Sequence, residues 1–97
     1  MREICQVWVE FQEWSLFGIC DDNAPGGKKL RKGRTIDELK EKAETDLLDG
    51  FTMITDDPDW SDAVYFKSCG LPDSEALVDA LTEFEGHTTY LHLDVPC

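Results

Sequence analysis

The sequence predicts an α+β domain in which two helices pack on one face of a mostly antiparallel sheet of about five strands. Short apolar runs that alternate with polar residues are typical of strands, and two segments carry apolar residues at the spacing of helical turns. A chain of 97 residues builds one hydrophobic core. We therefore expect a single domain over residues 1–97, with the element order β-β-α-β-β-α-β.

The N-terminal segment predicts a β-hairpin. Residues 4–11 alternate in polarity, residues 14–20 form a second apolar run, and only Gln12 and Glu13 separate the two. So short a connection favours a tight antiparallel turn, which would place Cys5 opposite Cys20. Residues 21–34 contain a Pro-Gly-Gly breaker and predict a long loop, in which Leu30 and its neighbours would add at most a short edge strand.

The first predicted helix begins at a capping box, with Thr35 as the N-cap and Glu38 three residues later. Apolar residues recur on one face of this helix up to Leu47, and Gly50 is the expected C-terminal stop. Strands are expected to follow over residues 51–55 and 63–68.

The second helix is expected over residues 73–86, with Leu77, Ala80, Leu81 and Phe84 facing inward and Gly86 at its end. A last strand follows over residues 87–95. The succession of strand, helix and strand thus occurs twice, with a glycine after each helix. A duplicated βαβ unit would explain this repetition, and so would coincidence, because glycine after a helix is common.

The net charge of the chain is −12, and it is unevenly distributed. Residues 35–97 hold sixteen acidic and three basic side chains, a net charge of −13, whereas five of the nine basic residues lie between positions 28 and 34. Such asymmetry restricts the choice of partner more than the choice of fold. It favours a partner with a basic surface, and it opposes tight binding of nucleic acid.

Two acidic segments are the predicted partner-binding sites. In the second helix, Glu75, Asp79 and Glu83 at i, i+4 and i+8 would form one anionic column, and no basic residue accompanies them. The turn over residues 56–62 adds a tryptophan that would be an apolar anchor, and its candidate residues are Asp56, Asp57, Asp59, Trp60 and Asp62. The alternative interpretation of both segments is the solvated surface of an acidic protein.

No catalytic or metal-binding motif is recognisable. His87 and His92 lie an odd number of residues apart on one predicted strand and would point to opposite faces, with no serine or cysteine nucleophile nearby in the sequence. The acidic turn lacks the glycine and the closing glutamate of a calcium loop, and the spacing of the four cysteines matches no zinc site. We therefore expect a non-enzymatic protein without cofactor or metal.

The predicted location is the cytoplasm. No apolar run reaches the length of a membrane span, and the first residues lack the apolar stretch of a signal peptide. Because the cytosol is reducing, we expect the cysteines to be free thiols.

Residues 33–39, Gly-Arg-Thr-Ile-Asp-Glu-Leu, follow two predicted strands and a loop, and this half of the chain resembles the strand-strand-helix pattern of HicB-like antitoxins. The resemblance implies a nucleic-acid-binding or antitoxin-like module that acts through the basic residues 28–34. The small size and acidity are similar to those of phage-encoded inhibitors that mimic DNA, including some anti-CRISPR proteins, which is a likeness of composition and not of motif.

The leading hypothesis is an inhibitor or adaptor that masks the basic surface of a partner protein, most simply one that handles nucleic acid. On this hypothesis the chain itself binds neither nucleic acid nor membranes. The alternative is the nucleic-acid-binding or HicB-like antitoxin module. The negative charge of residues 35–97 favours the first hypothesis over the second.

Overall fold

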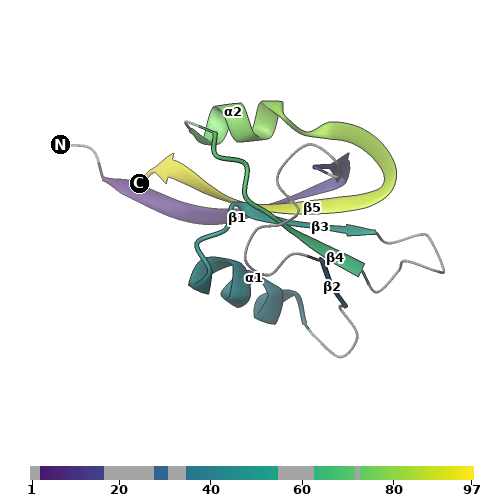
Figure 1. Cartoon of the computed structure of the whole chain (residues 1–97). Helices are drawn as coiled ribbons and strands as arrows, with labels where there is room; N and C mark the ends of the chain where they lie inside the picture. The colour runs from purple at the N-terminus through teal and green to yellow at the C-terminus, as the bar shows by residue number, and fades with distance from the viewer. Residues whose placement is uncertain (1–2, 17–27, 31–34, 55–62, 72) are drawn as a thin grey trace.

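The computed structural model describes residues 3–16, 28–30, 35–54, 63–71 and 73–97, which form one sheet and two helices (Figure 1). The elements are β1 (Ile4–Ser15), β2 (Lys28–Leu30), α1 (Ile36–Thr45), β3 (Gly50–Ile54), β4 (Ala63–Lys67), α2 (Ser74–Asp79) and β5 (Thr82–Pro96). The strand order is β1-β5-β3-β4-β2, and every neighbouring pair is antiparallel. The predicted α+β class with an antiparallel sheet and two helices is confirmed.

The predicted N-terminal hairpin is wrong. β1 continues through Gln12 and Glu13 to Ser15 and pairs with β5, from Ile4 opposite Pro96 to Ser15 opposite Thr82. Gln-Glu lacks the Gly, Asn or Asp that a two-residue turn needs. Of the two residues only Glu13 has a positive φ, 68°, and it lies where the β1–β5 register shifts. Residues 17–20, the rest of the predicted second strand, lie outside the described residues.

The second strand of the observed order lies instead within the segment predicted as a loop. Residues 28–30 form β2, which pairs with β4 at the edge of the sheet opposite β1. The sequence allowed a short edge strand around Leu30, and β2 is that strand. Residues 31–34 of the basic segment lie outside the described part of the chain.

The first helix begins as predicted and ends earlier. The Thr35 hydroxyl accepts the Glu38 backbone N–H at 3.2 Å. α1 ends at Thr45, Leu47 takes a left-handed φ of 57°, and the Leu48 N–H donates to the Ala43 carbonyl at 2.8 Å. This is a Schellman ending, in which the position usually held by glycine is held by a leucine.

Gly50, the predicted helix stop, has a different role. It opens β3 and lies so close to the carbonyl of Tyr90 on β5 that a side chain would overlap with that oxygen. Glycine at this position therefore permits the close approach of two strands.

The helices pack on opposite faces of the sheet, so the prediction of one shared face is wrong (Figure 1). α1 buries Leu39 against an aromatic layer that contains Phe51, whereas α2 buries Leu77 in a cluster with Leu91. β5 contributes to both clusters because successive residues of a strand point to opposite faces: Tyr90 packs with the first and Leu91 with the second.

The topology explains this placement. α1 connects β2 to β3 and α2 connects β4 to β5, and within each pair the two strands are parallel and separated by one other strand. Both connections step in the same direction across the sheet, but β2 and β4 run in opposite directions. Right-handed crossovers, which are the rule, then require the two helices to lie on opposite faces.

The second helix is much shorter than predicted. Asp73 caps it by accepting the Ala76 N–H at 2.8 Å, but α2 ends at Asp79, and residues 82–86 belong to β5. A helix extended to residue 86 would hold Glu83 and Glu85 at its C-terminal end, where the helix dipole disfavours negative charge. Gly86, the predicted end of this helix, lies inside β5 with a φ of 85°.

A disulfide joins Cys5 at the start of β1 to Cys97 at the end of the described chain, with the Cα atoms 5.2 Å apart. Cys69 is also disulfide-bonded, and none of the cysteines among the described residues is a free thiol. The prediction of free thiols is therefore wrong for these three. The predicted opposition of Cys5 and Cys20 fails with the hairpin, because β1 pairs with β5.

No helix within the described ranges is long and apolar enough to cross a membrane.

Replacing both Cys5 and Cys97 by serine should lower the free energy of unfolding by about 2–4 kcal/mol, because the bond closes a loop over a sequence separation of 92 residues. Urea denaturation of the variant and the wild type without reductant measures the difference. An unchanged free energy of unfolding would show that this bond does not form in solution.

Candidate functional site

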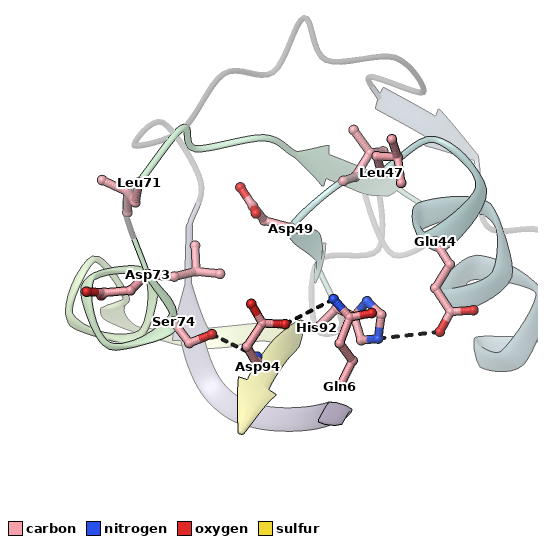
Figure 2. A pocket seen from close by; sticks show the side chains of 11 residues that line it. Gln6, Glu44, Leu47, Asp49, Leu71, Asp73, Ser74, His92 and Asp94 are labelled. Carbon is pink, nitrogen blue, oxygen red and sulfur yellow. Dashed lines mark hydrogen bonds and ion pairs between the residues drawn. The ribbon is translucent and has the colours of Figure 1, made fainter. Parts of the chain in front are cut away.

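A groove of about 660 Å³ lies at the end of the sheet where β1 begins and β5 ends (Figure 2). Its walls come from these two strands, from the turn after α1 and from the segment that leads into α2. Four carboxylates line it, those of Glu44, Asp49, Asp73 and Asp94, and the lining residues among the described part of the chain include no lysine or arginine. The groove is therefore a site of negative potential.

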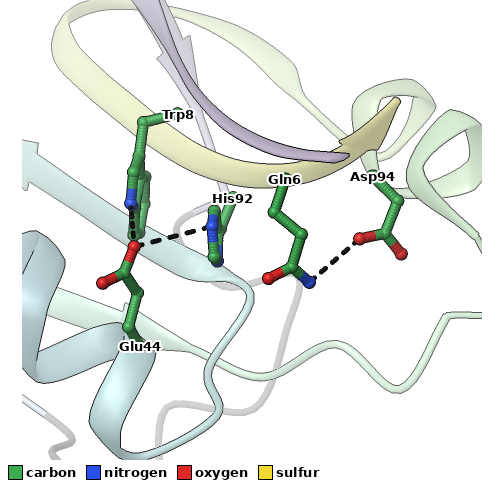
Figure 3. A network of polar contacts seen from close by, with 5 residues as sticks. All are labelled: Gln6, Trp8, Glu44, His92 and Asp94. Carbon is green, nitrogen blue, oxygen red and sulfur yellow. Dashed lines mark hydrogen bonds and ion pairs between the residues drawn. The ribbon is translucent and has the colours of Figure 1, made fainter. Parts of the chain in front are cut away.

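Glu44 is held at the groove by two aromatic residues (Figure 3). Its Oε1 accepts the indole N–H of Trp8 at 2.9 Å and lies 3.6 Å from Nε2 of His92. The imidazole of His92 stacks on the indole, with ring centroids 4.7 Å apart and an interplanar angle of 10°. About half of the Glu44 side chain, 49%, stays exposed, so its charge is oriented by the protein and accessible to a partner.

The other carboxylates are also fixed by hydrogen bonds. Asp94 Oδ1 accepts the amide of Gln6 at 3.0 Å across the β1–β5 pair, as Figure 3 shows. Asp49 Oδ2 accepts the Cys69 backbone N–H at 2.6 Å, and Asp73 is the N-cap of α2. Carboxylates held in this way lose little conformational freedom when a cation binds.

Two leucines add apolar surface to the acidic groove. Leu47 is 89% exposed and Leu71 is 41% exposed, and both line it (Figure 2). Leu47 also has the left-handed backbone described above, which costs a side-chain-bearing residue about 1 kcal/mol or more. Because Leu47 is both exposed and strained, it contributes little to the stability of the fold. It is therefore a candidate for contact with a partner.

Of the predicted binding residues, the structure describes Glu75, Asp79 and Glu83, and these three do not share one helix. Glu75 and Asp79 are exposed on α2, but Glu83 lies on β5, so the predicted helical column of three acids is wrong. Glu83 instead borders a shallow cleft of about 320 Å³ with Glu13 and Glu85. The predicted turn, with Asp56, Asp57, Asp59, Trp60 and Asp62, lies outside the described residues.

The groove itself was missed by the sequence analysis. Its acids come from residues 44–49, 73 and 94, and only the fold brings these positions together. Asp73 is recognisable in the sequence as a residue that can cap a helix, but an N-cap indicates local structure and says nothing about binding. Asp49 and Asp94 follow no motif, and the pairing of β1 with β5 that places Asp94 beside Gln6 leaves no local trace.

In the folded chain Ser15 lies beside His87, a contact that the sequence did not indicate. The Ser15 hydroxyl lies 2.9 Å from Nδ1 of His87, and both side chains are buried. Neither residue lines the groove. The contact joins the end of β1 to β5 beside the register shift. Each of the two buried polar side chains thereby has a hydrogen-bond partner, so a structural role explains the pair.

Within the described residues, no group of three or more His, Cys, Asp or Glu side chains is arranged to hold a metal ion. Comparison of the chain with known protein families, with characterised proteins and with solved structures finds no significant match.

Replacing Leu47 by glycine should raise the free energy of unfolding by about 0.5–1 kcal/mol, because glycine adopts the left-handed conformation without steric cost and little packing is lost. Urea denaturation provides the measurement. Asparagine at this position, which also tolerates that conformation, serves as the control. A lower stability for both variants would contradict the assigned helix ending.

Proposed function

We propose that the protein is a non-enzymatic inhibitor or adaptor that masks a basic surface of a partner protein, and that cationic side chains of the partner enter the groove. The observation that carries the proposal is the set of four hydrogen-bonded carboxylates in a groove whose described lining contains no lysine or arginine. The net charge of −12 would steer a basic partner towards the molecule, and the fixed acids would orient it.

A nucleic-acid-handling protein is the partner class that best fits this chemistry. Such proteins carry lysines and arginines arranged to meet phosphates, and a surface of fixed carboxylates offers the same charge. Leu47 supplies what a phosphate backbone lacks, an exposed apolar side chain at the rim. It would give the complex an anchor that salt does not screen, since apolar contact does not depend on ionic strength.

The two acidic surfaces predicted from the sequence, on the second helix and in the turn at residues 56–62, lie outside the groove's lining as described, and the proposal gives each a different role. Glu75 and Asp79 are exposed on α2, so they remain candidates for a secondary contact and provide a charge-matched comparison for the groove. The turn at residues 56–62 with Trp60 remains a prediction from the sequence.

The nucleic-acid-binding alternative uses the other edge of the sheet. β2, which begins the basic segment 28–34, is separated from β1 by three strands. The described strand of the basic segment, β2, and the strand β1 that borders the groove lie at opposite edges of the sheet, so variants of each can separate the two functions by experiment. Binding of duplex DNA or single-stranded RNA tighter than about 10 µM at physiological salt would promote the alternative.

The cytoplasmic location also remains a prediction. The redox state of the cysteines tests it, because a disulfide persists only in an oxidising compartment. Cytosolic thiols are kept reduced, so in that compartment Cys5 and Cys97 would be unpaired, whereas an oxidising compartment would preserve the bond. Alkylation of the protein in freshly lysed cells, followed by mass measurement, distinguishes the two states.

The groove acids are tested by the double variant Glu44→Gln and Asp94→Asn. Both amides keep the oxygen that accepts the hydrogen bond from Trp8 or Gln6, so only charge is removed. Affinity for a lysine- and arginine-rich peptide, measured by fluorescence anisotropy at low and moderate salt, should fall about tenfold or more, which corresponds to roughly 1.4 kcal/mol.

The matched control is Glu75→Gln with Asp79→Asn, which removes the same charge from the exposed surface of α2. If both double variants weaken binding equally, the groove acids contribute no more than the exposed acids of α2, and the groove is not the specific site. If neither has any effect, the proposed function itself fails.

A further inference from the structure

Among the described residues, β1 is an edge strand whose outer side pairs with no other strand. It spans 12 residues at one end of the strand order, and among the described residues it pairs with β5 only. A strand edge presents backbone N–H and C=O groups that are unpaired within the sheet, and these can hydrogen-bond to a further strand.

Backbone hydrogen bonds identify which residues of β1 face outward. The Cys97 N–H donates to the Glu3 carbonyl at 3.3 Å, so this opposed pair is a hydrogen-bonded one. Such pairs alternate along an antiparallel ladder, which directs the backbone groups of Cys5, Val7, Val9 and Phe11 towards β5. The residues between them point their N–H and C=O groups away from β5: Gln6, Trp8, Glu10 and Gln12.

An independent contact supports this assignment. The backbone N–H of His92, which lies opposite Trp8, donates to the Asp49 carbonyl at 2.9 Å on the far side of β5. His92 therefore does not donate to Trp8, as expected where the two form a non-hydrogen-bonded pair.

The free edge lacks the features that usually block strand addition. Between Ile4 and Gln12 there is no proline or lysine, the one charged side chain is Glu10, and the register shift comes only at Glu13. Ile4 and Val7 are 63% and 38% exposed. Soluble proteins blunt such edges with charges, prolines and bulges, so an open edge of this length is a candidate docking site.

We propose that β1 accepts an extended basic segment of the partner protein as an additional strand. This inference rests on the proposed function and adds the mode of recognition to it. The edge begins at Gln6, beside the groove that holds Asp94, and it carries Glu10 further along, so a strand laid on it would follow acidic side chains. A second copy of this chain would bring another net charge of −12 to the same edge and is disfavoured.

The pleat of β1 specifies the side chains of the added strand. Trp8 and Glu10 lie on the face covered by α1, where a lysine or arginine opposite Glu10 would meet its carboxylate. Val7 and Val9 lie on the opposite face, where an apolar side chain would extend the sheet surface. The fitting segment therefore alternates basic and apolar residues.

A labelled peptide of alternating lysine and valine, about as long as the free edge, is the probe. Two N-methylated forms of it block one backbone edge each, because alternate N–H groups of an extended peptide point to opposite sides. Since only one edge can meet β1, we expect one form to bind about tenfold more weakly or worse and the other to bind like the parent peptide. Equal affinities of all three peptides would overturn strand addition.

The corresponding variant of the protein is Glu10→Pro. It removes an outward N–H without removing a hydrogen bond to β5, and Glu10→Gln is the control that removes the charge alone. Glu10→Pro should bind the parent peptide about tenfold more weakly than Glu10→Gln, and equal affinities would contradict the inference. If Glu10→Pro does not fold, the comparison of the two N-methylated peptides still tests strand addition on the wild-type protein.

The two levels of the proposal fail in different ways. If the parent peptide binds, and binding responds to the groove variant but not to N-methylation or to Glu10→Pro, strand addition is wrong and the proposed function stands. If the parent peptide does not bind while the lysine- and arginine-rich peptide still does, strand addition is again wrong and the proposed function stands, and if neither peptide binds, both fail. Dimerisation of the wild type that Glu10→Pro abolishes, measured by sedimentation, would assign the edge to a second copy and overturn the inference.

Discussion

The pairing of β1 with β5 is the contact on which the rest of the structure depends, because it brings residues 4–15 against residues 82–96. Further interactions strengthen this one pair, among them the Cys5–Cys97 disulfide, the Gln6–Asp94 hydrogen bond and the Ser15–His87 contact. β5 in turn pairs with β3 and contributes side chains to both hydrophobic clusters. Loss of the ladder would therefore expose both faces of the sheet together.

The groove is a consequence of the same ladder. Gln6 and Asp94 face each other only because β1 and β5 are in this register, and His92 reaches Trp8 and Glu44 for the same reason. The acids are thus fixed by long-range pairing, while the exposed Leu47 is fixed by the local ending of α1. The fold therefore holds both the charges and the exposed leucine of this groove in place, and a preorganised surface of this kind reduces the entropy cost of binding in general.

The sequence predicted the features that depend on interactions between near neighbours along the chain, and it missed those that depend on residues distant in the sequence. The Thr35 cap, the start of the second helix at Asp73 and the strands near residues 51–55 and 63–68 depend on near neighbours, and the structure contains them. The end of α2 depends on β1 offering a partner to residues 82–83, and no periodicity within the helix reveals that. The groove was not predicted for the same reason, since its residues are distant in the sequence. The Cys5–Cys97 disulfide was missed because a reducing cytosol was assumed and because Cys5 was placed opposite Cys20.

Hydrogen exchange of the β1 amides, followed by NMR, tests this account most directly. The ladder with β5 predicts alternation: slow exchange at Cys5, Val7, Val9 and Phe11, and fast exchange at Gln6, Trp8, Glu10 and Gln12. Slow exchange at both sets would show that the outer edge is already covered, and fast exchange at both would show that the ladder is absent. Either result would contradict the central claim that β1 is held by β5 on one side and is open on the other.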